Sequence, residues 1–371
     1  MKLPSGEMIL IHGDSFIVQF SGPRDVLSTS WLNGGYRNDL KAVFNHQIPL
    51  AACDECHKNG GVSAYLAGIA ASRSLDPAAA CGLITRADMR NAAVITARYQ
   101  ELSVTAVVTA GIDKNGGRAG DPASYYEKDG QFAPVGGTIN TILILGADLP
   151  EYTLTRAVIT ATEAKTATLQ QLMARSLYSS GIATGSGTDM IAVIANPGAP
   201  LHLADAGTHA MLGELIAKTV IHATTLALER ETGLSPKSQQ NVLVRLSRFG
   251  ITAEELWTAA TRAGELQQSG PAEKEQFLYY LKQWAQCPEN VARAAAALHV
   301  LDEEAWGLLQ AGAAQEMIIR ILQDKDLEHT VAMNTPLETV TDQMSRLAAR
   351  DFGSQIAGKR DFTGPDTRRP I

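Results

Sequence analysis

The sequence predicts an α+β protein: a layered, mixed or mainly antiparallel sheet covered by helices, followed by an all-helical C-terminal domain. Three observations lead to this fold class. Short strand-like runs separated by glycine and proline fill the first third of the chain. Strand and helix patterns then alternate between residues 138 and 232, and only helical patterns continue beyond residue 233. A doubly wound parallel sheet is the alternative.

The first third of the chain reads as short strands with one helix. Gly13, Gly22 and Pro23 separate the first three runs, and such separators are typical of hairpins. The last two runs lie close together in sequence, which favours antiparallel pairing. The expected elements are strands at 8–11, 15–20 and 25–30, a helix at 62–72, and strands at 81–85, 92–99 and 104–112.

The middle of the chain alternates between strand and helix. It follows a polar, glycine-rich segment at 113–137. We expect a strand at 138–145, a helix at 150–176, a strand at 188–195 and a helix at 207–232. These helices would cover the sheet.

The chain divides into three expected parts. Residues 1–233 form the α+β domain, and Gly233-Leu234-Ser235-Pro236 reads as a boundary. Residues 234–349 are rich in Ala, Leu, Glu and Gln, which predicts a separate helical domain. Residues 350–371 carry Gly, Asp, Lys, Arg and Pro with few apolar anchors, which predicts a flexible tail.

Composition narrows the class of protein. The 371 residues are 19% charged with a net charge of -7, which argues against nucleic acid or an anionic membrane as partner. No run approaches the roughly 18 uncharged apolar residues of a membrane helix. The N-terminus lacks the pattern of an export signal, so we expect a cytoplasmic protein.

Cys53, Cys56 and His57 match the haem-attachment pattern C-x-x-C-H. Haem is attached outside the cytoplasm, and the other two cysteines, Cys81 and Cys287, do not complete a zinc ligand set. We therefore expect the two cysteines to lie in a loop and to have no specific role. A redox-sensitive or metal-binding pair is the alternative.

A glycine-rich turn at residues 182–189 is the strongest local sign of a site. Glycines allow close approach of the backbone to a ligand, and clustered oxygens beside them can act on it. A plain turn leading into a strand would look similar. The turn contains the hydroxyls of Thr184, Ser186 and Thr188, the carboxylate of Asp189, and Gly185 and Gly187.

Lys165 lies within an apolar stripe of the helix expected at 150–176. Its ammonium must either snorkel to the edge of the helix or meet a partner. Burial would lower its pKa and suit it to act as a base or as a donor to an oxyanion. Glu163 points to another side of the helix, so it is not the expected partner.

His209 is expected in the first turn of the last helix of the domain, capped by Thr208 or Asp205. The helix dipole there disfavours the imidazolium form, so a neutral ring could accept a proton. This makes His209 the preferred general base; a surface or capping histidine is the alternative. Asp189 could orient His209, bind a metal or cap its own turn.

Three further polar residues are candidates for binding a substrate. Thr138 and Asn140 begin an expected strand and could offer a hydroxyl and an amide to a carbonyl group. Asn45 could line the same cleft. Local turn hydrogen bonds are the alternative for all three.

Together, ordered motifs resemble the adenosylcobinamide amidohydrolase family from about residue 25 to 232. Two departures are visible: Ser186 stands where threonine is expected, and residues 48–61 match nothing recognisable. The motifs are, in order, Thr109-Ala110-Gly111-Ile112, Asn115, Ala119-Gly120-Asp121, residues 136–140, residues 161–167, the glycine-rich turn, Ala206-Gly207-Thr208-His209 and Leu212-Gly213-Glu214.

The resemblance implies hydrolysis of the amide that joins the corrin side chain of adenosylcobinamide to aminopropanol, giving adenosylcobyric acid. A non-catalytic corrinoid-binding or sensing protein, or an unrelated threonine-nucleophile hydrolase, are the alternatives. A hydroxyl nucleophile and an activated water both remain open. The expected partner is a corrinoid substrate, with no cofactor; a divalent metal and a homo-oligomer are left open.

Overall fold

The computed structural model describes residues 1–52, 60–124, 126, 137–266, 271–322 and 335–360. The chain forms two compact units, Met1–Pro236 and Lys237–Ile371. The first unit therefore ends inside the segment at 233–236 that the sequence marks as a boundary. Each unit is described by itself.

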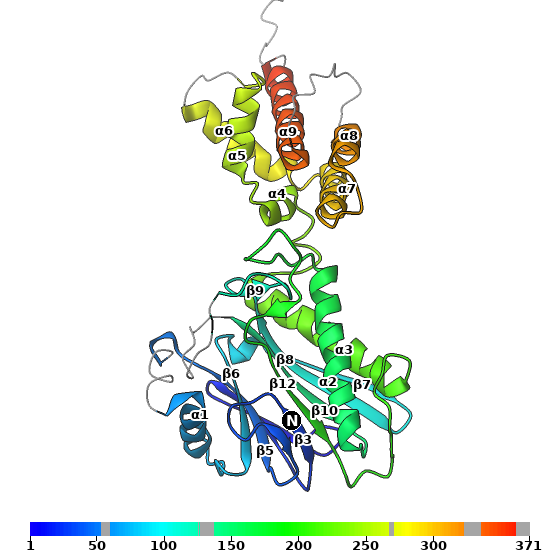
Figure 1. Cartoon of the computed structure of the whole chain (residues 1–371). Coiled ribbons are helices and arrows are strands. Elements are labelled where there is room, and N and C mark those ends of the chain that lie inside the picture. Colours follow the sequence, from blue (N-terminus) through cyan, green and yellow to red (C-terminus); the bar gives the residue numbers. More distant parts are fainter. Residues whose placement is uncertain (53–59, 125, 127–136, 267–270, 323–334, 361–371) are drawn as a thin grey trace, which may run out of the picture. The chain divides into compact units, whose positions relative to one another are not determined.

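The first unit contains strands in two main sheets and three longer helices (Figure 1). The strands are β1 (Met8–His12), β2 (Ser15–Gln19), β3 (Asp25–Ser28), β4 (Gly35–Arg37), β5 (Ala42–Gln47), β6 (Ala80–Thr85), β7 (Ala93–Tyr99), β8 (Leu102–Gly111), β9 (Gly116–Gly117), β10 (Thr138–Leu145), β11 (Gly185–Ser186) and β12 (Met190–Ala195). The helices are α1 (Gly61–Ser72), α2 (Glu151–Gln171) and α3 (Met211–Thr232).

Both main sheets are mixed and mainly antiparallel. A four-stranded sheet has the order β1-β2-β5-β6, and a six-stranded sheet has the order β4-β3-β12-β10-β8-β7. Within them only β5 with β6 and β10 with β12 pair in parallel, each across a helical crossover. The predicted α+β class is confirmed, and the doubly wound parallel sheet is wrong.

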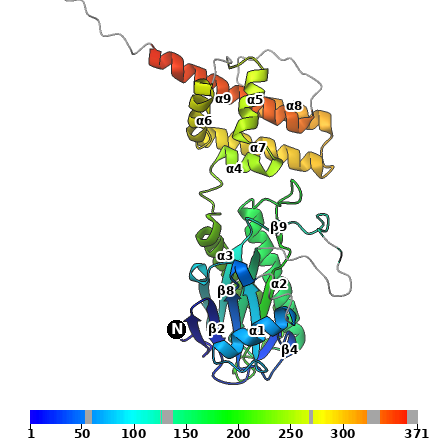
Figure 2. The same ribbon diagram turned by 90° about the vertical axis from the view of Figure 1, so that its left-hand side faces the viewer.

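The two sheets stack face to face, and helices cover their outer faces (Figures 1 and 2). Apolar side chains of α1 pack on the four-stranded sheet. A second cluster fills the space between the sheets, and a third joins the six-stranded sheet to α2 and α3. The order of layers is helix, sheet, sheet, helix.

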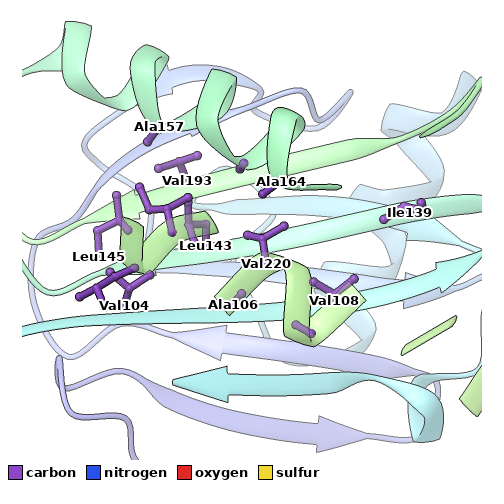
Figure 3. Packing of buried hydrophobic residues seen from close by; sticks show 14 of the residues in the cluster. Val104, Ala106, Val108, Ile139, Leu143, Leu145, Ala157, Ala164, Val193 and Val220 are labelled. Carbon is purple, nitrogen blue, oxygen red and sulfur yellow. The ribbon is translucent and has the colours of Figure 1, made fainter. Parts of the chain in front are cut away.

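The central strand β10 shows how alternation builds these layers. Ile142 and Ile144 face the four-stranded sheet, whereas Leu143 and Leu145 face the helices, as Figure 3 shows for the latter pair. All eight residues of the strand are buried. Each such aliphatic side chain contributes about 1.5–3 kcal/mol when removed from water.

The early strands are only partly hairpins. β1 pairs with β2 in the predicted hairpin, and β7 pairs with β8 as expected. However, β2 also pairs with β5, a strand that was not expected from the sequence. β3 pairs with β12 in the other sheet. Pairing between segments so distant in sequence depends on packing, which local patterns do not encode.

The end of α2 also differs from expectation. α2 ends at Gln171 instead of residue 176, because Met173 adopts a left-handed backbone with φ of 49° and turns the chain.

Within the described residues, α3 alone is long and apolar enough to cross a membrane. It packs on β7 and β8 with 56% of its apolar window buried, so its composition reflects the core of the domain.

The second unit is helical, as predicted, and has its own apolar core. Its described helices are α4 (Val242–Leu246), α5 (Ala253–Arg262), α6 (Pro271–Trp284), α7 (Pro288–Ala305), α8 (Ala311–Leu322) and α9 (Pro336–Arg360). Inside it, Arg248 and Asp302 form a buried two-point ion pair at 2.6 and 2.7 Å.

The expected tail needs correction. α9 continues to Arg360, and Phe352 in this stretch is buried against Phe277 and Tyr280. One aromatic anchor thus extends the helix beyond residue 349, although the surrounding residues are polar. Residues 361–371 lie outside the described part of the chain.

A buried histidine connects α1 to the four-stranded sheet. His46 Nδ1 lies 2.9 Å from Ser15 Oγ, and its Nε2 lies 3.0 Å from the Tyr65 hydroxyl. Asp14 lies 3.5 Å from the ring and pairs with Arg73. Burial lowers the pKa of His46, and the charge of Asp14 offsets this in part. The ring is therefore neutral at neutral pH.

This network predicts a pH dependence of stability. Because the folded pKa of His46 is below its unfolded value of about 6.5, the unfolded chain binds the proton more readily. The free energy of unfolding should fall as pH drops through and below about 6.5. Urea unfolding of the intact protein and of His46→Gln measures this. Equal pH slopes for the two proteins would contradict it.

Candidate active site

The polar residues of the site gather where three central strands of the six-stranded sheet end or begin. Thr138, first in β10, pairs with Gly111, last in β8, and Asn140 pairs with Met190, first in β12. The small ribbon of β9 and β11 lies just before β12 in the path of the chain, with Gly185 opposite Gly117. Asp189 immediately precedes β12.

Asp189 is the most heavily bonded of these groups. Its Oδ1 accepts hydrogen bonds from the Ile139 N–H at 2.9 Å and from Ser186 Oγ at 2.6 Å. Its Oδ2 accepts from the Ser186 N–H at 3.0 Å and from Lys165 Nζ at 2.5 Å. The carboxylate therefore ties together α2, β10 and the glycine-rich turn.

Lys165 meets a partner rather than snorkelling to the edge of α2. The side chains of Lys165 and Asp189 are 14% and 15% exposed, so the ion pair is largely shielded from water. A pair of this kind is stronger than one on the surface, and each charge depends on the other for compensation. The anomalous position of the lysine in an apolar stripe is explained by this contact.

The two hydroxyls after Gly185 have different hydrogen bonds. Ser186 Oγ donates to a carboxylate, that of Asp189. Thr188 Oγ1 donates to the Gly137 carbonyl at 2.6 Å and lies 3.4 Å from Asn115 Nδ2. Only the serine proton thus points at a group that can take it up, because a backbone carbonyl is not a base.

Gly185 lies directly against the ion pair. A methyl group there would lie 2.4 Å from Asp189 Oδ2 and 2.9 Å from Lys165 Nζ, so a side chain at this position would have to displace the ion pair. At Gly187 the nearest atom, Asn115 Oδ1, would be at an ordinary 3.6 Å. Thr184 joins two distant segments, because its hydroxyl accepts the Ala119 N–H at 2.9 Å.

Three of the six expected substrate-binding residues, which also include Thr184, Gly185 and Gly187, form a buried chain between the sheets. Thr138 Oγ1 donates to the Thr188 carbonyl at 2.7 Å and lies 3.0 Å from Asn140 Oδ1. Asn140 Nδ2 donates to Asn45 Oδ1 at 2.8 Å, and Asn45 in turn donates to Thr109 Oγ1. Thr138, Asn140 and Asn45 are each less than 5% exposed. Through Thr138 these contacts reach the turn that carries Thr188, just before β12.

His209 is not brought to this cluster. α3 begins at Met211 with Ala210 as N-cap and without a side-chain cap, so His209 lies before the helix, and Thr208 and Asp205 do not cap it. The helix runs along β8. Only its last turn, where Glu231 lies beside Gly111, reaches the end of the sheet at which the cluster lies. Twenty-two residues of helix span about 33 Å. The exposed His209 therefore lies near the other end of the sheet.

The sequence analysis gave no role to two residues that contact the cluster. Asn115 is buried, and its amide donates to the Gly137 carbonyl at 3.1 Å. The Tyr178 hydroxyl donates to Asn115 Oδ1 at 3.1 Å. Asn115 belongs to the ordered family motifs, and nothing else in the sequence indicates that it contributes to a site. Nothing local in the sequence marks Tyr178.

No metal site is visible in the part of the chain that the structure describes. Within it, no three His, Cys, Asp or Glu side chains are arranged to hold a metal ion. Cys53, Cys56 and His57 lie outside the described residues.

The cluster contains a hydroxyl, a carboxylate that accepts its hydrogen bond, and an ammonium paired with that carboxylate. Hydrolases that act by acyl transfer use groups of these kinds. The sequence profile of the adenosylcobinamide amidohydrolase family matches residues 2–236, which is the whole first unit. The chain belongs to this amidohydrolase family.

Two individual proteins are also similar. An uncharacterized protein of Methanocaldococcus jannaschii is 36% identical over 229 residues, which cover 58% of this chain and 86% of the relative. The crystal structure of a protein from Pyrococcus horikoshii matches at 13% identity with a TM-score of 0.31, covering 61% of this chain and 83% of that one.

The contrast between the two glycines gives a test of the site geometry. Gly185→Ala should displace the ion pair and lower the free energy of unfolding by about 1–3 kcal/mol. Gly187→Ala should change it by less than about 0.5 kcal/mol. Neither glycine has a left-handed backbone, so strain does not differ between the variants. Denaturant unfolding measures both, and equal losses would show that Gly185 does not limit the packing of Asp189.

Proposed function

We propose that the protein hydrolyses the amide between the corrin side chain and aminopropanol of adenosylcobinamide, releasing adenosylcobyric acid and 1-amino-2-propanol. Family membership supports the substrate. The observation that carries the chemistry is the contact of Ser186 Oγ with Asp189, whose carboxylate is paired with Lys165.

In the proposed mechanism, Ser186 Oγ attacks the amide carbonyl and its proton passes to Asp189. The Lys165 ammonium, with donors left after its bond to Asp189, stabilises the oxyanion. The proton then moves to the departing amine, which leaves an ester on Ser186. Water hydrolyses the ester, releases the carboxylic acid and restores the serine hydroxyl.

No cofactor enters this proposal. The Asp189 carboxylate already accepts from four donors, one of which is the serine hydroxyl, so its acceptor positions are occupied within the protein. Turnover that stops after chelation and returns with a divalent metal would overturn this part of the mechanism.

The direct test is to incubate the purified full-length protein with adenosylcobinamide and to follow both products by mass spectrometry. Formation of adenosylcobyric acid with an equal amount of 1-amino-2-propanol supports the proposal. Corrinoid binding without products over a long incubation would instead indicate a binding or sensing protein. Cleavage of other amides with the corrinoid left intact would indicate an unrelated hydrolase.

The two hydroxyls should respond differently to substitution. Ser186→Ala should lower kcat by about 100-fold or more, because the attacking oxygen is lost. Thr188→Val should have a smaller effect, because that hydroxyl donates only to the Gly137 carbonyl. Steady-state kinetics of the two variants measures the difference.

A covalent intermediate separates a serine nucleophile from an activated water. Rapid quenching of the wild-type protein should give a mass increase equal to the corrinoid acyl group, located on the peptide that contains Ser186. If Ser186→Ala keeps near-normal turnover, the attacking group is water and the serine only positions Asp189.

Lys165→Met tests the ion pair. The change leaves the Asp189 carboxylate without its cation, so the free energy of unfolding should fall by about 1–3 kcal/mol. Activity should fall by about 100-fold if the ammonium stabilises the oxyanion. Thermal unfolding and kcat measure the two effects.

The double variant Lys165→Met with Asp189→Asn provides the control. It removes both charges, so stability should recover at least in part while activity stays low. A double variant that recovers activity along with stability would show that the pair acts only in folding.

A further inference from the structure

We propose that the exposed ring face of Tyr178 is the surface on which the flat ring system of the substrate rests while Ser186 reaches the side-chain amide. This inference rests on the proposed function and extends it, since it names a residue that recognises the corrin ring. The position, the rigidity and the exposure of Tyr178 support it.

Tyr178 is joined to the reacting groups through one residue. Its hydroxyl donates to Asn115 Oδ1 at 3.1 Å, and Asn115 Nδ2 lies 3.4 Å from Thr188 Oγ1. Thr188 Oγ1 lies 3.5 Å from Ser186 Oγ. The aromatic ring is thus linked to the candidate nucleophile through Asn115 and Thr188.

The loop that carries Tyr178 is fixed on several sides. The Leu177 N–H donates to the Gly116 carbonyl at 2.9 Å, and the Tyr178 N–H donates to Ser176 Oγ at 3.0 Å. Ser176 Oγ donates in turn to Asp121 Oδ2 at 2.6 Å, and the same oxygen accepts the Arg118 N–H. The tyrosine therefore does not have to be ordered when a ligand binds.

Gly117 lies beside the ring. A methyl group at this glycine would be in ordinary van der Waals contact with two ring carbons of Tyr178, at 3.5 and 3.6 Å. Yet the residue remains 40% exposed, although an aromatic side chain gains much from burial. A fixed aromatic ring, held at its hydroxyl and open to solvent, is suited to stacking on a flat ligand.

Equilibrium dialysis with adenosylcobyric acid tests the inference without relying on catalysis. This product has the ring but no scissile amide. Tyr178→Ala should weaken its binding about tenfold or more, whereas Tyr178→Phe, which keeps the ring, should bind like wild type. Tyr152→Ala is the matched control, because Tyr152 is 66% exposed at the first turn of α2, away from the cluster.

With adenosylcobinamide as substrate, Tyr178→Ala should raise KM, whereas Tyr178→Phe should mainly lower kcat through the lost bond to Asn115. Unchanged binding in Tyr178→Ala, or equal losses in Tyr178→Phe and Tyr178→Ala, would overturn the inference. Circular dichroism confirms that each variant is folded. Wild-type protein that binds the ring but releases no product would contradict the proposed function alone, and the binding of the variants would still decide this inference.

Discussion

The Asp189 carboxylate is the point on which the site depends. It is held by a backbone N–H of β10, by the backbone and side chain of Ser186, and by the ammonium of Lys165 from α2. A shielded charge must be compensated, so these four donors and the carboxylate fix one another. The helix, the sheet and the glycine-rich turn consequently meet in one geometry.

The two-sheet architecture makes this meeting possible. β10 and β12 are parallel neighbours joined by α2, so the chain must return along the helix to the amino end of the sheet before β12 begins. Lys165 lies late in α2, and Asp189 lies at the end of that return path. The buried chain from Thr138 through Asn140 to Asn45 then ties the second sheet to the same end.

The same architecture separates residues that look equivalent in sequence. His209 and Lys165 were both candidates for proton transfer, and both belong to the helical layer. α2 brings Lys165 to the amino ends of β10 and β12. The last turn of α3 also lies there, whereas its first turn lies near the other end of the sheet. The direction of each helix decides which residue contacts Asp189.

The sequence by itself determined the fold class, most strands and helices, the glycine-rich turn and the anomaly of Lys165, because each depends on local periodicity and composition. Only the tertiary structure decided that Lys165 pairs with Asp189, that Asn45 and Asn140 are buried between two sheets, and that His209 lies apart. β5, Tyr178 and the helical end of α9 were missed for the same reason. Their roles depend on contacts with distant segments, and local patterns carry no information about such contacts.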